Sequence, residues 1–520
     1  MNIYIRTDAN KSIGLGHFSR TLRLANYFNK KGHCVEIFLD KKNDLITSFA
    51  KDNPRININF LYGVGQNFIN QKKDAKIFIK RIKKDSTVIL DDYRLDYNWE
   101  KKVRAYVKRV AIIEDQNLAE HYCDVIINSN PKYIEKDNYI DKNKLFRSIN
   151  LLGPMYSILD NENRKTQQNR KNLTFYFGGS GNLIYFFNLI NQFYKNKLNR
   201  KNNINFIIGP LCKNKKKIYL LEKKINNFKI HENKTNISNI LSKTDLLICS
   251  SGMITIESAF QKIPSICFQV SNNQIIENKY LEKLGLYINL KKADLSNYQK
   301  VSEIIELYIK NIEFYSKIFQ PKIKIDNLGK KRIFDAILFK QEKNKIKKKS
   351  ANLDFSRRLY ALNDLAVNEY LDARNLLINR KNSGSAQKIK ILDHYIWWLK
   401  DKKKINVLIK NNKKMMYIRN DIIQNYNQKI CFNGFVIANE KLNGLDVIWA
   451  LKKNLEFLEK NHKRLKIFSV VKKNNNFANL HTKFINFQLY RFQSKSINQV
   501  IKKKIGSLDK LNVYVYKNHY

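Results

Sequence analysis

The stretch RTDANKSIGLGHFSR, residues 6–20, decides the fold of the first part of the chain. An apolar run ends at Arg6, a loop with two glycines follows, and an amphipathic segment starts near His17. This order predicts a β-strand, a loop and an α-helix. Glycines such as Gly14 and Gly16 let a backbone approach a ligand closely, and the amides of a helix N-terminus favour phosphate. Because a lone Gly-x-Gly pattern is a weak signal, an ordinary strand-to-helix turn stays the alternative.

Charged side chains surround His17 in this stretch. Arg6 and Asp8 precede it and Arg20 follows it, so all three are candidate substrate contacts. An imidazole titrates near neutral pH, which makes His17 a candidate base for taking a proton from water. A histidine that only caps its own helix is the alternative.

Strand-like apolar runs alternate with helical patterns through about the first 330 residues. This alternation predicts an α/β fold with βαβ units and parallel sheets. A polar stretch at 160–172 interrupts the pattern, which then restarts, so we expect two Rossmann-like lobes. A second polar stretch, at 341–350, precedes about 170 residues with the texture of one α+β domain. We therefore predict three domains at residues 1–160, 170–335 and 352–520.

The composition excludes several classes of protein. Of the 520 residues, 43% are hydrophobic and 12% aromatic, which is enough to form cores and argues against intrinsic disorder. No apolar run approaches the roughly 20 residues of a membrane helix, and we expect no signal peptide. The six cysteines are scattered without a Cys-x-x-Cys pair, which argues against a zinc ribbon or a disulfide framework. A reduced, cytoplasmic protein is the simplest expectation.

The formal net charge of +52 has two explanations. Lysine can simply fill permissive surface positions, or the charge can serve a polyanion or an anionic membrane surface. The basic clusters are short and dispersed, and none lies in a recognisable nucleic-acid module, so we expect no specific nucleic-acid partner. Either explanation favours an anionic small-molecule substrate.

A second candidate site follows a buried run that ends at Cys249. The sequence SSGMITIE, residues 250–257, predicts a small-residue loop and then a helix with Glu257 in its first turns. Ligands bind at the carboxyl ends of strands in such sheets. Glu257 is a candidate acceptor for ribose hydroxyls, with an ordinary solvent-facing helix residue as the alternative. The candidate pyrophosphate contacts are the amides of Ser251, Gly252 and Met253. A third loop, with the candidate substrate-binding residues Gly178 and Gly179, follows another strand and is expected to face the same cleft.

Together these motifs resemble the UDP-2,4-diacetamido-2,4,6-trideoxy-β-L-altropyranose hydrolases of pseudaminic (nonulosonic) acid biosynthesis. That family consists of inverting hydrolases that are similar in fold to the two-lobed GT-B glycosyltransferases. The resemblance extends over about the first 330 residues in the same order. It rests on residues 6–20, LDDY at 90–93, IED at 113–115, LGPMY at 152–156, GGS at 178–180, SSGMITIE at 250–257, IP at 263–264 and NNQ at 272–274.

The resemblance implies a role for individual residues. By position, His17 is the catalytic base, Gly14 and Gly16 shape its loop, Tyr93 lines the sugar site, Glu257 holds the ribose, and Asn273 and Gln274 contact the sugar. One departure is the pair Gly181 and Asn182, where the family loop often continues with aspartate.

The implied chemistry requires neither a metal nor a cofactor. UDP is already a good leaving group, so an enzyme needs mainly to steady the pyrophosphate and activate one water molecule. A base acting on the face opposite UDP inverts the anomeric centre. We find no spacing of His, Asp and Glu that demands a metal ion.

The last 170 residues resemble the GNAT-family N-acetyltransferases, which implies acetyl-CoA as a possible co-substrate. The resemblance rests on Arg374, Asn375, Arg380, His394, Trp397 and Trp398, and later on Val471, Asn475, Ala478 and Phe487. Gly444 and Asn475 are the implied acetyl-CoA contacts. Asp446 stands where the family's phosphate loop has a small residue, and we expect its carboxylate to repel the phosphates, so acetyl-CoA binding stays open. For His394, Trp397 and Trp398 we favour ordinary core or capping roles.

The sequence therefore predicts a metal-independent hydrolase of a UDP-linked amino sugar, and leaves open whether the chain is bifunctional with an N-acetyltransferase. Two alternatives stay open. One is a UDP-sugar glycosyltransferase of the GT-B type, which needs an acceptor instead of water. The other is a polyanion-binding protein whose GNAT-like part is inactive.

Overall fold

The computed structural model describes most of the chain in two compact units. The first comprises Met1–Ser302 and Phe319–Lys345, and the second comprises Glu303–Ile318 and Ile346–Tyr520. The described residues are 1–9, 15–42, 46–47, 53–63, 67–115, 119–135, 139–145, 148–160, 171–179, 181–198, 201–232, 237–270, 278–285, 287–318, 321, 323, 325–338, 357–361, 367–382, 387–400, 405–411, 413–425, 428–462 and 464–517. None of the described helices combines the length and the apolar content that a membrane crossing requires. The three domain limits given above stay predictions.

The first lobe of the first unit is a seven-stranded, all-parallel sheet in the order β3-β2-β1-β4-β5-β6-β7. The order reverses between β1 and β4, and such a reversal is where doubly wound sheets bind ligands. Its strands are β1 (Asn2–Thr7), β2 (Cys34–Leu39), β3 (Asn57–Phe60), β4 (Thr87–Asp91), β5 (Arg109–Ile113), β6 (Val125–Asn128) and β7 (Ile149–Leu152). Its helices are α1 (Gly16–Lys30), α3 (Gln71–Ile79) and α4 (Tyr97–Arg104), with short 3-10 helices η1 (Pro131–Ile134) and η3 (Pro154–Tyr156).

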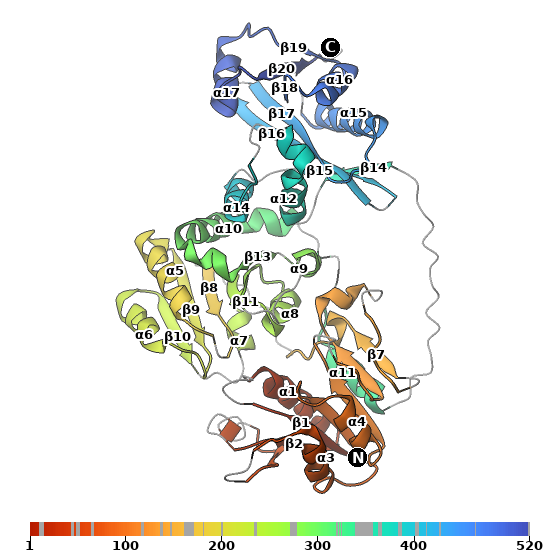
Figure 1. The fold of residues 1–520 in the computed structure, drawn as a ribbon. Coiled ribbons are helices and arrows are strands. Elements are labelled where there is room, and N and C mark those ends of the chain that lie inside the picture. Colours follow the sequence, from red (N-terminus) through yellow and green to blue (C-terminus); the bar gives the residue numbers. More distant parts are fainter. Residues whose placement is uncertain are drawn as a thin grey trace. The chain divides into compact units, whose positions relative to one another are not determined.

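Each face of this sheet has its own core. On one face α1 buries Phe18 and Phe28 against the strands, and on the other Phe78 of α3 and Trp99 of α4 are fully buried. Helix α11 (Gly329–Leu338) follows the second lobe in sequence but adds Ile333 to the α1 core. In Figure 1 this teal helix lies among the red and orange elements of the first lobe. Helix α11, near the end of the first unit, therefore completes the core under α1 at its beginning.

A buried ion-pair network joins β1 to α3. Arg6 and Asp74 are both fully buried, and an Arg6 Nη2–Asp74 Oδ2 distance of 2.7 Å connects them. Tyr62 and Trp99 also donate hydrogen bonds to Asp74, at 2.8 Å each. Removing one partner of such a pair leaves an uncompensated buried charge, which costs more than the pair itself contributes.

We predict that Asp74→Ala lowers the free energy of unfolding of the first unit by about 3–5 kcal/mol, because it leaves the Arg6 guanidinium buried with less compensation. Hydrogen exchange of peptides from β1 and α3 measures this loss. The matched control is Asp335→Ala, which removes the partner of Lys331 in an exposed pair and is expected to leave exchange near that of the parent. Equal protection in both variants would contradict the role of Asp74.

The second lobe repeats the strand order of the first. Its six parallel strands run β10-β9-β8-β11-β12-β13, again with a reversal beside the first strand. The strands are β8 (Lys171–Tyr176), β9 (Asn202–Ile208), β10 (Phe228–Glu232), β11 (Leu246–Ser250), β12 (Ser265–Gln269) and β13 (Tyr287–Lys291). The helices are α5 (Ile184–Lys195), α6 (Lys215–Lys224), α7 (Ser238–Leu241), α8 (Met253–Phe260) and α9 (Asn278–Leu284), with 3-10 helix η6 (Lys292–Ser296). Helix α10 (Tyr298–Ile318) starts in the first unit and belongs to the second unit from Glu303 onward. The prediction of two Rossmann-like lobes is confirmed.

The second unit contains a mixed sheet in the order β14-β15-β16-β17-β18-β20-β19, drawn in teal to dark blue in Figure 1. Its pairs are antiparallel except β17–β18, which is parallel and pairs over only four residues of each strand, Ile430–Asn433 and Lys466–Ser469. The strands are β14 (Arg357–Ala361), β15 (Ile405–Lys410), β16 (Lys413–Asn425), β17 (Gln428–Ile437), β18 (Lys466–Lys472), β19 (Phe487–Leu489) and β20 (Leu511–Tyr516). The helices are α12 (Val367–Asn375), α13 (Leu377–Lys381), α14 (Ile391–Lys400), α15 (Gly444–Asn461), α16 (Asn476–Phe484) and α17 (Lys495–Ile505).

Candidate functional site

A histidine–carboxylate pair lies at the ends of β1 and β4. Helix α1 begins at Gly16, which puts His17 in its first turn, and His17 Nδ1 lies 2.5 Å from Asp91 Oδ1. The Asp91 carboxylate is fully buried and the His17 side chain is 13% exposed. A carboxylate only accepts hydrogen bonds, so this contact assigns a proton to Nδ1 and leaves Nε2 with the lone pair of the neutral ring. Asp91, and not the helix backbone, therefore orients the imidazole.

Arg20 fixes the same carboxylate from the next turn of α1. Its Nε lies 2.6 Å from Asp91 Oδ2, and its Nη1 lies 2.7 Å from Asp115 Oδ2. Asp115 also accepts a hydrogen bond from the hydroxyl of Tyr93. The Tyr93 ring meets the His17 ring edge to face, with a centroid distance of 4.5 Å, and Tyr93 is 48% exposed. The structure thus brings His17, Arg20 and Tyr93, which the sequence singled out separately, into one cluster.

The charges in this cluster set the protonation of His17. Burial alone would lower the pKa of His17, but the Asp91 carboxylate raises it, and the net shift is upward. Burial would raise the pKa of Asp91, but Arg20 and His17 hold it well below its usual range. Asp91 therefore stays ionised across the working pH range, and His17 becomes a free base only above its raised pKa.

We predict that His17 titrates above the ordinary histidine value of 6.5, and that Asp91→Asn moves its titration midpoint to lower pH. The sign follows because the carboxylate stabilises the protonated ring, so its removal favours the neutral ring. NMR titration of ¹³C-labelled histidine measures both midpoints, with His17→Gln identifying the signal. Asp85→Asn, an exposed substitution away from His17, serves as the control. An unchanged midpoint in Asp91→Asn would contradict the pairing.

Arg6 and Asp8 occupy supporting positions instead of the predicted direct substrate contacts. The Arg6 side chain is fully buried and binds Asp74 and Asp40, with a distance of 2.5 Å to Asp40. Asp8 is 2% exposed and lies 3.2 Å from Arg94. Buried side chains with these partners hold the strand ends in place, and neither presents its charge to a ligand.

Two predicted loops of the second lobe follow the neighbouring strands β8 and β11. Gly178 has a φ of +81° and Gly252 a φ of +149°, both in the region that favours glycine. An added Cβ on Gly178 would come within 3.7 Å of Ser250 Oγ, so the two loops are close together. An added Cβ on Gly179 would contact Leu15, directly before α1. The loops of both lobes therefore approach one another at strand ends.

The predicted amide contact of Ser251 needs a correction. Its N–H donates to Phe268 O at 3.1 Å, because β12 continues alongside the end of β11. What Ser251 offers instead is its hydroxyl, which is buried without a hydrogen-bond partner. The predicted pyrophosphate amides of this loop are therefore reduced to those of Gly252 and Met253.

Glu257 lies against the first lobe. Its Oε1 is 2.5 Å from Arg23 Nη1 of α1, and Arg23 Nε is 3.2 Å from Asp160. Glu257 is 6% exposed, which excludes the solvent-facing alternative, and its Oε2 is buried without a partner. An unpaired buried acceptor is costly, so Oε2 is suited to receive a ligand hydroxyl.

Sequence reasoning missed three of these residues. Asp91 and Asp115 lie inside motifs that carried the family resemblance, so their motifs gave a signal. Arg23 gave none beyond its place one helical turn after Arg20.

Some predicted positions carry no further test. Gly14, Asn273 and Gln274 lie outside the described residues. Asn182 accepts the Ile184 N–H at 3.1 Å, so this departure from the family pattern serves the start of α5.

Within the described part of the chain, no group of three or more His, Cys, Asp or Glu is arranged to hold a metal ion.

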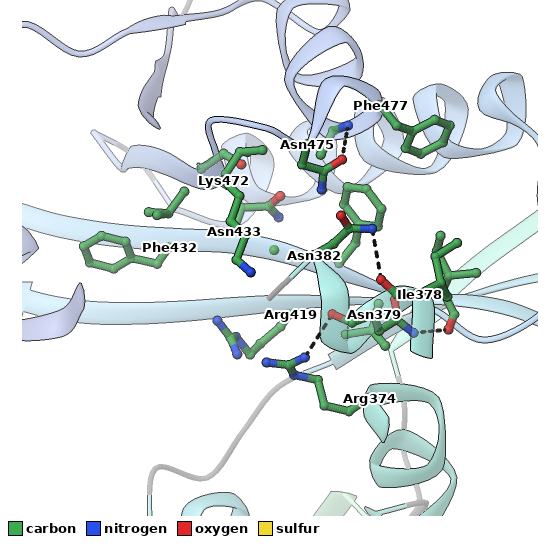
Figure 2. Close-up of a pocket in the computed structure, with 18 of the residues that line it drawn as sticks. Arg374, Ile378, Asn379, Asn382, Arg419, Phe432, Asn433, Lys472, Asn475 and Phe477 are labelled. Atoms are coloured by element: carbon green, nitrogen blue, oxygen red, sulfur yellow. Dashed lines mark hydrogen bonds between the residues drawn. The ribbon is translucent and has the colours of Figure 1, made fainter. Parts of the chain in front are cut away.

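The second unit contains a cavity of about 800 Å³ where β17 and β18 diverge. Figure 2 shows its lining, with Arg374 and Arg419 on one side and Lys472 and Asn475 on the other. Asn475 also accepts the Ala478 N–H at 3.1 Å. The cavity therefore combines cations and amides with a strand edge that β18 no longer pairs, and Asn379 bonds the N–H and the carbonyl of Ile437 on that edge.

The predicted acetyl-CoA loop differs from expectation in two ways. Gly444 packs on His481, whose Nε2 would lie 2.8 Å from an added Cβ, and the residue is not part of the cavity wall. Asp446 is 1% exposed and pairs with Lys410 at 2.9 Å and Arg357 at 3.4 Å. These cations compensate the carboxylate, so the expected repulsion of phosphates loses its basis.

His394 and Trp398 have core roles, in agreement with the core or capping roles that we favour from the sequence. Both are nearly inaccessible, and His394 Nε2 lies 3.0 Å from Val367 O. Burial lowers the pKa of His394 to about 4. Neither residue is in the wall of the large cavity.

Comparisons with known proteins concern mainly the first unit. The model of the glycosyltransferase family 28 C-terminal domain matches residues 173–333, which span the second lobe and half of α11. An uncharacterised protein of Methanocaldococcus jannaschii is 27% identical over 349 residues, 61% of this chain and 68% of that protein. The UDP-2,4-diacetamido-2,4,6-trideoxy-β-L-altropyranose hydrolase of Campylobacter jejuni is 22% identical over 297 residues, 56% of this chain and 100% of that protein. The crystal structure of Acinetobacter baumannii MurG is 14% identical, with a TM-score of 0.44 over 65% of this chain and 99% of that one.

Proposed function

We propose that the first unit hydrolyses UDP-2,4-diacetamido-2,4,6-trideoxy-β-L-altropyranose, releasing UDP as a cytoplasmic step of pseudaminic acid biosynthesis. The observation that carries this proposal is the imidazole of His17, whose Nδ1 is held by buried Asp91 at 2.5 Å so that Nε2 is left for a water molecule. The similarity to the Campylobacter jejuni hydrolase supports the choice of sugar.

The proposed reaction needs one base and a grip on UDP. His17 Nε2 takes a proton from water while the water oxygen bonds to the anomeric carbon and the bond to the UDP oxygen breaks. Attack opposite UDP inverts the anomeric centre. The amides of Gly252 and Met253 steady the departing pyrophosphate at the start of α8, and Glu257 Oε2 accepts from the ribose. UDP leaves as a stable anion. The proposed reaction therefore requires neither a carboxylic acid to protonate the leaving group nor a metal ion to neutralise it.

Glycosyl transfer is the competing function. The match of residues 173–333 to the glycosyltransferase family 28 model favours it. Transfer uses the same grip on UDP but replaces water with an acceptor hydroxyl. The two functions therefore differ in one requirement. Hydrolysis releases UDP from the sugar nucleotide in water alone, whereas transfer releases it only when an acceptor is added.

We predict that the purified protein releases UDP from the diacetamido sugar nucleotide without added metal or acceptor. His17→Ala is expected to lower the rate by about 10²–10⁴-fold, the usual contribution of a general base, and to leave the affinity for UDP unchanged. A coupled assay measures UDP, calorimetry measures its affinity, and NMR of the first sugar product shows the anomeric inversion. Hydrolysis by His17→Ala at the parent rate would remove His17 from the mechanism.

Glu257→Ala is the complementary control. It is expected to weaken UDP binding by about 10–100-fold, because it removes a buried acceptor and frees Arg23. Unchanged affinity would remove the ribose role. UDP release that appears only when an acceptor sugar is added would establish transfer instead of hydrolysis.

For the second unit we propose acetyl-CoA-dependent N-acetylation of the 4-amino group of the same sugar, one step earlier. The observation that favours it is the cavity between β17 and β18, where the pairing stops at Asn433 and the strand edge beyond it faces the cavity. A strand edge can bond the amides of the pantetheine chain, and Arg374, Arg419 and Lys472 can bind phosphates. In the transfer the amine nitrogen bonds to the acetyl carbon, the thioester C–S bond breaks, and the amine proton accompanies the thiol of CoA.

Gly434→Trp tests this proposal, because Gly434 lines the cavity and the nearest atom to an added Cβ is the end of the Arg419 side chain at 3.9 Å. We expect the parent to bind acetyl-CoA in calorimetry and this variant to lose at least about tenfold in affinity, the effect of a blocked pocket contact. Leu480→Trp, exposed and outside the cavity wall, is the control. Absence of binding in the parent, or equal binding in Gly434→Trp, would contradict the assignment.

A further inference from the structure

A second, smaller cavity of about 120 Å³ lies beside Tyr93 at the ends of β4 and β5. Half of the residues in its wall are aliphatic. The aliphatic side chains are Leu90, Leu95, Ile112, Ile113 and Ala119. The polar side chains are Asp92, Tyr93, Glu100, Glu114 and His121. The space suits a small acyl group or a few water molecules.

His121 belongs to the wall of this cavity and has one unsatisfied ring nitrogen. The residue is 5% exposed, its Nδ1 lies 2.8 Å from Glu100 Oε1, and its Nε2 is buried without a hydrogen-bond partner. Because Glu100 takes Nδ1, Nε2 is the ring nitrogen that is left for a ligand. A buried polar atom without a partner costs free energy, so a ligand that supplies one gains in affinity.

The other polar groups in the wall have partners. Glu100 also accepts the Tyr122 N–H at 2.5 Å, Glu114 accepts from Asn128 at 3.0 Å, and Asp92 pairs with Arg94 at 2.5 Å. Three carboxylates around one small space repel an anion. An ammonium group would lose its hydration against five aliphatic side chains. The wall is therefore suited to a neutral group with an apolar end.

We propose that this cavity is the subsite for an acetamido group of the sugar, with the methyl group against the aliphatic wall and the amide bonded to His121 Nε2. This inference rests on the proposed function of the first unit, since it assigns a substituent of the same substrate. An amide suits His121 in either protonation state. A neutral ring accepts the amide N–H through Nε2, and a protonated ring donates to the carbonyl oxygen.

Two neighbouring features support this occupant. Tyr93 belongs both to the wall of this cavity and to the cluster around His17, so a sugar beside Tyr93 has a substituent within reach of the subsite. Water is a poorer occupant, because a buried water molecule needs two to four polar partners and the wall leaves His121 Nε2 as the unsatisfied one among its described side chains. A plain hydroxyl group would leave most of the cavity empty.

Ala119→Leu tests the subsite, because it places a larger side chain in the cavity from a half-buried position and keeps His121 intact. The probes are the UDP-diacetamido sugar and its two analogues in which one acetamido group is a free amine. Calorimetry in a His17→Ala background, which preserves the ligands, gives the affinities. We expect one analogue to bind about 10–100-fold more weakly than the diacetamido sugar, and Ala119→Leu to reduce this preference to near one.

The controls separate the subsite from the reaction and from folding. Ala105→Leu, exposed at the end of α4 and outside the cavity, should keep the preference of the parent. His121→Gln should lose it, and UDP affinity and thermal unfolding show that both cavity variants are folded. A preference that survives Ala119→Leu, or equal binding of all three probes, would overturn the subsite even if the protein hydrolyses the sugar. If the binding preference and its loss in Ala119→Leu are observed but the parent protein releases no UDP, the hydrolase proposal is contradicted and the subsite is supported. If none of the three probes binds, both proposals are contradicted.

Discussion

The buried carboxylate of Asp91 is the constraint on which the candidate active site depends. It lies at the end of a central strand with no exposed surface, so it needs compensation from cations and hydrogen-bond donors. Both come from α1, where Arg20 occupies both carboxylate oxygens and His17 binds one. The interaction that compensates the buried charge thus also fixes the start of α1 and the tautomer of His17.

Much of the fold was predictable because strand and helix periods alternate clearly in the first 330 residues. The parts that were not predictable depend on contacts between distant segments. An amphipathic pattern shows that α11 buries one face, but not that Ile333 joins the core of α1. In sequence Arg6 is a charged residue at the end of an expected strand, and only its partners Asp74 and Asp40 from other segments explain its burial. The N–H of Ser251 is unavailable to a ligand because it donates to Phe268 O of the neighbouring strand β12.

The role of Asp91 shows what the sequence withholds even inside a recognised motif. Side chains alternate along a strand, so Asp91 and Asp92 must face opposite sides of the sheet. Ile89 belongs to the core under α1 and Leu90 to the core under α3 and α4. By the same alternation Asp91 meets His17, and Asp92 meets Arg94. The motif alone shows two adjacent carboxylates; assigning each requires knowing which helix covers which face.

The candidate sites of the two units share a physical origin. Where a parallel strand runs past the end of its partner, its backbone groups are free to meet a ligand, and nearby loops can carry side chains. In the first unit the candidate residues follow the carboxyl ends of β1, β4, β8 and β11. In the second unit β17 and β18 form the one parallel pair among the described strands, and the large cavity opens where that pair stops. Asp446 was expected to repel phosphates because its position in the phosphate-loop motif suggested that its carboxylate lies beside them. Its actual place is set by Lys410 and Arg357 on neighbouring strands, which compensate its charge.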